Sequence, residues 1–420
     1  MRRIPRMFRS IENRNYRLYF FGQGFSMLGS WLQSVAQAWL VYALTGSSFD
    51  LGLVAFIGQA PLLVLSPIGG LLSDLYRRRW LVVATQTCSM VLAFVLAALV
   101  LAGHVRMWQI LLLAGLQGVV YAVDVPARQA LVAEIVDADE LLNAVALNSS
   151  AFSNASSVAP IVAGFLVAAI GEGWCFALNG LTYLAVIVGL ILMRVDEHRK
   201  KEGVRTAVSD MRDGFRFVHD TTPIRRILVL AAIVSLLGAP FTVLMPVFAD
   251  KVLHAGPQGL GILMSTVGVG SLIGSLLLAS RRGLLGLGRW MVWSAAALGA
   301  ALVLFSLSRS FVVSLAILAP AGFCLFYLAT ASNTLIQAMA PEAMRGRTIG
   351  ILSMLVLGVA PFGALAAGVL ADRFGAPVTV AAGGLACIVV SVMCAFDLPA
   401  LTVKGRQLIA ANFVPAGIHR

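Results

Sequence analysis

One carboxylate followed closely by three guanidinium groups is the most distinctive charged stretch of the sequence. Asp74 ends a long apolar run, and Arg77, Arg78 and Arg79 follow it within five residues. These groups can form ion pairs but are costly inside hydrocarbon. The stretch therefore predicts the point where a membrane-spanning helix leaves the lipid. Gly69 and Gly70 lie just upstream, where missing side chains favour close packing of a neighbouring helix.

Two further carboxylates lie at the ends of apolar runs and are candidate proton sites. Asp50 precedes one run, and Asp124 ends another, where it is followed by Pro126 and Arg128. A carboxyl group held away from water can exchange protons closer to neutral pH than an exposed one. We expect both groups near the membrane surfaces, so proton exchange at either one stays a hypothesis.

Neutral polar side chains recur inside several apolar runs. Polar groups in a membrane usually face the interior of a helix bundle, so these residues are candidates to line a central cavity. Each could equally form a hydrogen bond between helices. The candidates are Gln23, Gln33, Gln37, Gln117, Tyr121, Asn148, Asn154, Tyr327, Asn333 and Gln337.

The composition places these residues in a membrane protein. The chain has 420 residues, of which 59% are hydrophobic and 12% charged, whereas a soluble domain is closer to half apolar and a quarter charged. The apolar runs are about 20 residues long, which suits helices rather than the strands of a barrel. We predict an all-α protein with twelve spans at about 18–44, 51–73, 81–102, 108–125, 141–170, 174–193, 227–249, 259–280, 290–307, 311–338, 348–371 and 377–396.

The distribution of positive charge predicts the topology. On the twelve-span arrangement all 31 Lys and Arg residues lie outside the spans, and only Arg106, Lys251, Arg309 and Arg373 fall on one side. The strongly basic side is expected to be cytoplasmic, with both termini on it. The expected organisation is an N-terminal six-helix bundle (1–193), a cytoplasmic loop (194–226), a second bundle (227–403) and a tail (404–420).

Two motifs resemble those of the major facilitator superfamily. The stretch around Asp74 is similar to the loop between the second and third spans of these transporters, with matches at Gly70, Leu72, Asp74, Arg78 and Arg79. The stretch Asp-Val-Pro-Ala-Arg-Gln-Ala at 124–130 resembles one in the exporter branch that contains enterobactin exporters and macrolide efflux pumps. The resemblance covers most of the chain and implies two six-helix bundles that alternate in access.

The resemblance also implies roles for single residues. Asp74 would lie near the N-terminal end of span 11, and the basic residues after it would pair with an acid at the end of span 4, here Asp124. This lock would hold the cytoplasmic side closed. Pro160 on span 5 stands where the antiporter motif has Gly-Pro, although Ala159 replaces that glycine. A plain packing kink is the alternative interpretation of Pro160.

The function implied is efflux of an amphipathic small molecule, siderophore-like or drug-like, driven by protons across a bacterial inner membrane. We expect a monomer that works in the lipid bilayer without cofactor, metal or nucleic acid. A facilitator or importer of a metabolite is the first alternative, and a non-transporting receptor on the same fold is the second. An enzyme is disfavoured because the sequence offers no nucleophile–base pair, metal cluster or ATP-binding loop.

Overall fold

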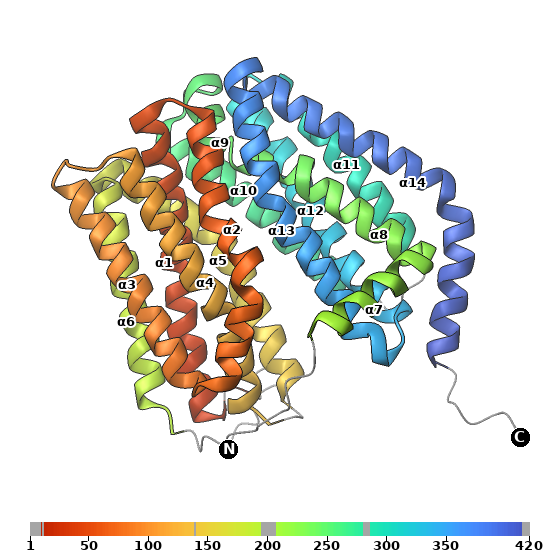
Figure 1. Ribbon diagram of the computed structural model, residues 1–420. Coiled ribbons are helices and arrows are strands. Elements are labelled where there is room, and N and C mark those ends of the chain that lie inside the picture. The colour runs from red at the N-terminus through yellow and green to blue at the C-terminus, as the bar shows by residue number, and fades with distance from the viewer. Residues whose placement is uncertain (1–9, 11, 138–139, 195–206, 280–285, 414–420) are drawn as a thin grey trace, which may run out of the picture. The chain divides into compact units, whose positions relative to one another are not determined.

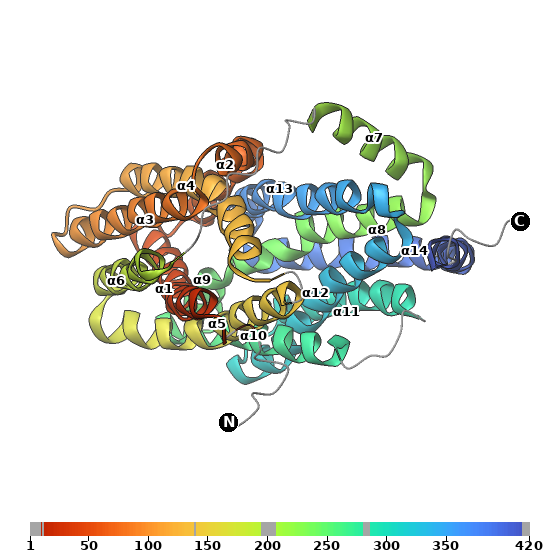
Figure 2. The same cartoon turned by 90° about the horizontal axis from the view of Figure 1, so that it is seen from below.

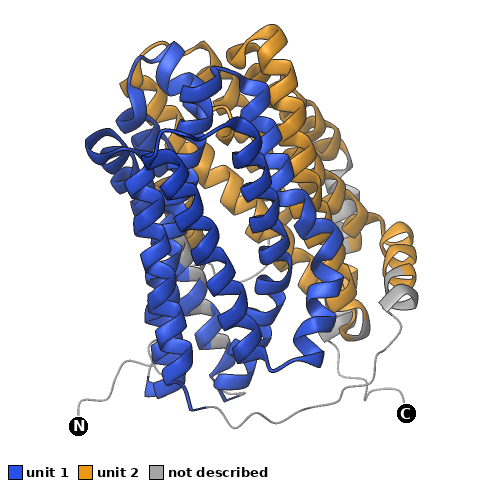
Figure 3. Ribbon diagram, turned by 60° about the vertical axis from the view of Figure 1, so that its left-hand side comes forward, with its two compact units in different colours: residues 1–202, 245–268 blue, residues 203–244, 269–420 orange. Residues whose placement is uncertain are grey.

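Helices account for nearly all of the structure. The computed structural model describes residues 10, 12–137, 140–194, 207–279 and 286–413. The chain forms two compact units, distinguished by colour in Figure 3. Unit 1 comprises residues 1–202 and 245–268, and unit 2 comprises residues 203–244 and 269–420. Residues 245–268, expected in the second bundle, therefore group with the first unit.

Unit 1 is built on six long helices, labelled in Figure 1. The cap residues explain where the first two begin: the Asn13 side chain accepts hydrogen bonds from two backbone N–H groups of α1, and Ser47 accepts one from Asp50 of α2. Gly46 ends α1 in the left-handed conformation, with a φ of 62°. The six helices are α1 (Arg14–Thr45), α2 (Ser48–Leu75), α3 (Arg78–Leu101), α4 (Met107–Ile135), α5 (Leu141–Ile170) and α6 (Glu172–Leu192).

Unit 2 contains most of the remaining helical structure. Two helical segments are divided between the units, namely 222–252 and α10 (Gly256–Ala279), whose residues 256–268 belong to unit 1. The segment Thr222–Val252 starts in unit 2 as α8 (Thr222–Ile233), η2 (Val234–Gly238) and η3 (Ala239–Thr242), and continues in unit 1 as α9 (Met245–Val247) and η4 (Phe248–Val252). Pro240 and Pro246 lack backbone donors, which explains why a regular α-helix does not continue. The other helices are α7 (Ala207–Asp220), α11 (Leu287–Leu307), α12 (Phe311–Met339), α13 (Glu342–Phe374) and α14 (Ala376–Phe413).

The predicted fold class is confirmed. Ten helical segments among the described residues are long and apolar enough to cross a membrane. They correspond to ten of the twelve expected spans. The other two, spans 1 and 5, are present as helices α1 and α5, which carry many of the amide and hydroxyl side chains noted above. The protein is therefore a multi-pass, all-helical membrane protein.

Small residues let the helices of unit 1 approach closely. The pairs α2–α4, α1–α6 and α3–α6 make the most extensive contacts, and Figure 2 shows these helices side by side. Gly69 of α2 lies against the Ala122 carbonyl of α4, and Gly118 of α4 lies against the Gly58 carbonyl of α2. Gly268 of α10 likewise lies against the Ser156 carbonyl of α5.

Two helices extend beyond the expected boundaries. Span 4 was expected to end at Val125, but α4 continues through Pro126 to Ile135. The tail was expected to begin at 404, but α14 continues to Phe413. In addition, the expected central loop contains the helix α7. The longer α4 matters for function, because it moves Asp124 and Arg128 from a helix end into a helix interior.

Candidate functional site

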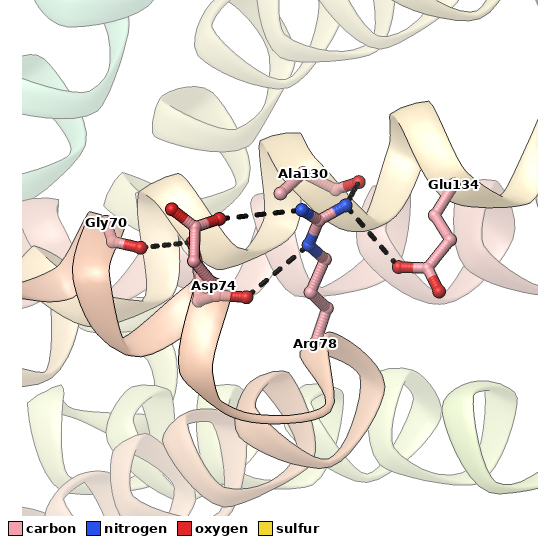
Figure 4. A network of polar contacts seen from close by, with 6 residues as sticks. Gly70, Asp74, Arg78, Ala130 and Glu134 are labelled. Carbon is pink, nitrogen blue, oxygen red and sulfur yellow. Dashed lines mark hydrogen bonds and ion pairs between the residues drawn. The ribbon is translucent and has the colours of Figure 1, made fainter. Parts of the chain in front are cut away.

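Arg78 joins the end of α2 to α4 through a network of weak contacts, shown in Figure 4. Its guanidinium lies 3.6 Å from Asp74 and 3.6 Å from Glu134, and donates to the Ala130 carbonyl at 3.5 Å and to the Ser73 carbonyl at 3.4 Å. The Asp74 side chain is 68% exposed. Long distances and solvent exposure make each contact weak, so the network can exchange partners at low cost.

The expected pairing of the basic loop with Asp124 was wrong. The acid of α4 that meets Arg78 is Glu134, ten residues further along the helix. Arg79 does not join it, but donates to the Ile191 carbonyl of α6 at 2.9 Å. The prediction failed because it ended span 4 too early, and thereby placed Asp124 at the membrane surface.

Asp124 is instead the centre of a buried network between α3 and α4. Its side chain is 1% exposed. One oxygen accepts hydrogen bonds from the Thr85 hydroxyl at 2.6 Å and the Gln86 amide at 2.9 Å, and the other lies 2.6 Å from Nε of Arg128. Neither Thr85 nor Gln86 was predicted as a site residue. The sequence feature that could have identified them is a polar dipeptide, Thr-Gln, inside the apolar run of span 3.

Three tyrosines extend this network toward other helices of unit 1. Tyr121 of α4 hydrogen-bonds to Tyr183 of α6, and both interact electrostatically with Arg128. Tyr19 of α1 interacts with both charges of the ion pair and is itself buried. Charged groups and their polar partners from α1, α3, α4 and α6 thus converge in the interior of one unit. We call Thr85, Gln86, Asp124 and Arg128 the buried network.

Buried charge of this kind is expensive and needs compensation. Asp124 lies 11 residues before the end of α4 at Ile135, which is about 16 Å along the helix. A carboxylate at such a position would cost several kcal/mol without partners. Two hydrogen bonds and an arginine supply that compensation here.

Asp50, the other proton candidate, has an ordinary structural environment. It lies in the first turn of α2, next to the Ser47 cap, and its side chain is half-buried. The partial positive charge of a helix N-terminus stabilises a carboxylate at this position. This placement accounts for Asp50 without a proton-carrying role.

Most of the predicted cavity residues in unit 1 hydrogen-bond to neighbouring helices. Gln33 accepts from Asn179 of α6 at 2.6 Å, and Gln117 donates to Ser89 of α3 at 2.9 Å. Asn148 accepts from the Tyr16 hydroxyl at 3.5 Å. Tyr121 belongs to the tyrosine group described above, and Gln23 is buried. Gln37 is half-buried and Asn154 is exposed.

The predicted cavity residues of unit 2 lie on α12. Gln337 donates to Asn333 at 3.0 Å along the same helix, and Gln337 is exposed. Tyr327 is buried and stacks on Phe323 with the ring centroids 5.7 Å apart. The amide pair at 333 and 337 therefore remains a candidate for ligand contact, while Tyr327 belongs to the packing of the unit.

An apolar cavity lies between α2 and α4. It has a volume of about 710 Å³, and every lining residue is apolar, including Phe56, Pro61, Leu112 and Leu116. It is open to the surface of the unit, since the lining residues Val64, Leu112 and Leu116 are exposed. The lining residues are apolar residues within predicted spans, so no polar side chain in the sequence indicated this cavity.

Pro160 lies at a second close helix contact. Its carbonyl lies against Gly261 of α10, and Gly164 of α5 approaches the Pro257 carbonyl. At the far end of α1, Lys251 lies 5.6 Å from the ring centroid of Tyr42 and 3.5 Å from the Gly46 carbonyl. These contacts hold residues 245–268 against α1 and α5 in unit 1, and only Pro160 among them was a predicted site residue.

Comparison with known proteins places the geometry in context. Residues 7–416 match the family described as transmembrane secretion effector. The staphyloferrin A transporter of Staphylococcus aureus is 25% identical over 390 residues, which cover 92% of this chain and 97% of the relative. The multidrug efflux pump Tap of Mycolicibacterium fortuitum is 26% identical, covering 89% and 93%. The enterobactin exporter EntS of Escherichia coli is 24% identical, covering 90% of each chain.

Solved structures share the fold at low sequence identity. A bacterial homolog of the human lysosomal transporter Spinster aligns with a TM-score of 0.69 at 14% identity, covering 96% of this chain and 98% of that one. A variant of the nucleoside transporter NupG aligns with a TM-score of 0.72 at 13% identity, covering 93% and 98%. Identities this low establish the fold, while function has to be argued from the residues.

Proposed function

Because this chain belongs to the transmembrane secretion effector family of major facilitator transporters, we propose that it exports an amphipathic small molecule in exchange for protons. As a member of this family the protein is a membrane transporter of small molecules and not an enzyme. The proposal adds the direction, the driving force and the class of cargo. It also adds alternating access by two six-helix bundles in a bacterial inner membrane, with a monomeric protein and both termini in the cytoplasm.

The burial of the Asp124 carboxylate beside Arg128 is the observation that supports proton coupling. This carboxylate is almost fully buried and contacts an arginine that has further polar neighbours, Tyr19 and Tyr121. A movement that separates Arg128 from Asp124 would leave the carboxylate uncompensated, and proton binding would then relieve the cost. Arg128 stays protonated throughout, so the bound proton neutralises one charge per cycle.

The gate is proposed at the Arg78 network. Arg78 contacts Asp74 and Glu134 at ion-pair distances that are long and partly exposed. Breaking such contacts costs roughly 1 kcal/mol or less each, which suits a lock that opens in every cycle. Arg77 and Gly70 belong to the same loop and helix end, and the motif resemblance supports a shared role in the conformational change.

The cargo class follows from the relatives and from the chemistry of unit 1. The relatives' names refer to enterobactin, staphyloferrin A and multidrug efflux, which supports a siderophore-like or drug-like molecule. The apolar cavity between α2 and α4 supports a cargo with a sizeable hydrophobic part.

The decisive experiment measures transport in proteoliposomes with an imposed pH gradient. A panel of siderophores and macrolides is tested with and without an uncoupler. We expect gradient-driven transport of at least one compound, abolished by the uncoupler. Asp124→Asn leaves Arg128 without its partner, so thermal unfolding in detergent first establishes that the variant is folded. The folded variant should lack the dependence on the gradient, whereas Asp50→Asn should retain it.

One observation favours a facilitator over a proton-coupled exporter. One Asp124 oxygen accepts two hydrogen bonds and the other lies in the ion pair with Arg128, so the network could serve structure alone. In that case the purified protein would move cargo down its own gradient, with or without the uncoupler. Transport by Asp124→Asn at the wild-type rate would then favour the facilitator over the proton-coupled exporter.

A further inference from the structure

Four arginines gather at one end of unit 1, away from the Arg78 network. Asn15 of α1 and Arg194 after α6 exchange two hydrogen bonds, at 2.8 and 3.1 Å. Arg14 and Arg17 flank Asn15 in the first turn of α1, and both are exposed. Arg79 at the start of α3 donates to the Ile191 carbonyl, three residues before Arg194. We call Arg14, Arg17, Arg79 and Arg194 the arginine cluster.

The charges of the cluster are not neutralised within the described part of the chain. None of the four arginines makes an ion pair with a described acid. Glu12, two residues before Arg14, is exposed, and Asp196 and Glu197, which follow Arg194, lie outside the described residues. The Nε–H of Arg79 is buried and lacks a hydrogen-bond partner among the described residues. A buried donor without a partner is costly, so this end of the unit has both excess positive charge and an unmet demand for an acceptor.

Apolar side chains border the cluster on the outer surface of the same helices. Trp80 is 48% exposed, and its ring lies 5.2 Å from the guanidinium carbon of Arg79. Ile191 and Leu192 of α6 and Phe21 of α1 are likewise exposed. Tryptophan is enriched where a protein crosses from hydrocarbon to headgroups. The surface therefore changes from apolar to cationic over about one helical turn.

We propose that the arginine cluster binds the headgroup of an anionic phospholipid, with its acyl chains along the apolar border. Arginine recognises phosphate through paired, charge-assisted hydrogen bonds, and the exposed side chains of Arg14, Arg17 and Arg194 can supply such donors. Basic sites between helices on the cytoplasmic side suit anionic headgroups. The proposal rests on the membrane placement of the protein but is independent of its cargo and of proton coupling.

The bound lipid would act on the start of α3. Arg79 is adjacent to Arg78, whose contacts tie α2 to α4. A headgroup that bridges Arg79 and Arg194 fixes the beginning of α3 against the end of α6. The lipid thereby stabilises one arrangement of the loop that carries Asp74, and so biases the gate without touching the cargo.

Native mass spectrometry of the full-length protein in mild detergent tests the proposal. The protein is titrated with phosphatidylglycerol or with phosphatidylcholine that has the same acyl chains. We expect phosphatidylglycerol to bind roughly tenfold more tightly or better, since each arginine near the headgroup contributes about 1 kcal/mol. Equal binding of the two lipids would overturn the proposal.

Matched variants assign the preference to the cluster. Arg79→Gln with Arg194→Gln should abolish the preference, whereas Arg79→Lys with Arg194→Lys should keep most of it. Arg212→Gln with Arg216→Gln removes two exposed arginines of α7 and should leave the preference unchanged. An equal loss in both glutamine pairs would show a general charge effect and overturn the assignment. Complete displacement of the lipid by millimolar inorganic phosphate would assign the site to a free anion instead.

Discussion

Two aspartate–arginine pairs with the same spacing behave differently in this protein. Asp74–Arg78 and Asp124–Arg128 are both separated by four residues. The first pair is 3.6 Å apart, its aspartate is 68% exposed, and it straddles the break between α2 and α3. The second is 2.6 Å apart, its aspartate is 1% exposed, and it lies within one helix. Spacing and residue type alone therefore do not predict what a charged pair contributes.

The difference follows from the surroundings of each carboxylate. An exposed ion pair contributes roughly 0–1 kcal/mol, because water competes for both charges. A buried one contributes little net stability, but removing one partner costs about 3–5 kcal/mol because a bare charge remains. The Arg78 pair can thus be broken and remade cheaply, whereas the Arg128 pair changes only together with a change in protonation or in packing.

Removal of Arg128 should give the largest effect. Arg128→Met keeps the length of the side chain but leaves the Asp124 carboxylate buried without its cation. We expect a loss of about 3–5 kcal/mol in the free energy of unfolding, measured by thermal or denaturant unfolding in detergent. The same change at Arg78 should cost roughly 1 kcal/mol or less.

A double variant shows whether the cost comes from the bare charge. Asp124→Leu combined with Arg128→Met removes both charges, and it should be much less destabilising than Arg128→Met alone. If the effects of the two substitutions on the free energy of unfolding are instead additive, the pair is not the main source of the cost. The contrast between the two ion pairs would then fail.

Loss of a single hydrogen bond in the buried network should give a smaller effect. Thr85→Val removes the hydroxyl that donates to Asp124 and keeps the shape of the side chain. A hydrogen bond to a charged group contributes about 1.5–3 kcal/mol, and we expect a destabilisation in that range. Thr87→Val is the matched control, because the Thr87 hydroxyl donates to the Val83 carbonyl of its own helix. Equal effects at the two positions would argue that Asp124 does not depend on Thr85.

The sequence was sufficient for the architecture because hydropathy and charge placement are repeated over the whole chain. Runs of apolar residues predicted the helices, and the exclusion of Lys and Arg predicted their ends. The same criterion failed at α4, because Asp124, Pro126 and Arg128 together resemble the end of a helix. They are tolerated inside α4 because α3 supplies Thr85 and Gln86, which lie about forty residues away in sequence.

The ion pairs of the predicted site residues differ from the expected pairing. Asp74, Arg78, Asp124 and Arg128 were all recognised as candidates, since charges are conspicuous in an apolar chain. Which acid meets which arginine depends on how far α4 continues and on the rotation of α3 against it. Glu134 was placed in a surface loop for the same reason. No local pattern distinguishes Glu134 from Asp124 as the partner of Arg78.

Packing beside the exposed pair can be tested with two adjacent glycines. A side chain at Gly69 would collide with the Ala122 carbonyl of α4, whereas a side chain at Gly70 meets nothing within 4 Å. Gly69→Ala should therefore destabilise the protein by about 1–3 kcal/mol. Gly70→Ala should be neutral or stabilising by up to about 1 kcal/mol, since alanine is the better helix former. Unfolding measurements on the two variants check the difference.

Asp74→Asn should give the smallest change in stability and still affect transport. The substitution removes one weak, exposed ion pair, so unfolding should shift by less than about 1 kcal/mol. If the Arg78 network is the gate, transport should fall although the protein remains folded and inserted. Glu134→Gln should behave in the same way, because both acids contact the same guanidinium. Wild-type transport in both variants would leave the exposed pair without a conformational role, and the buried network alone would then have to couple the two states.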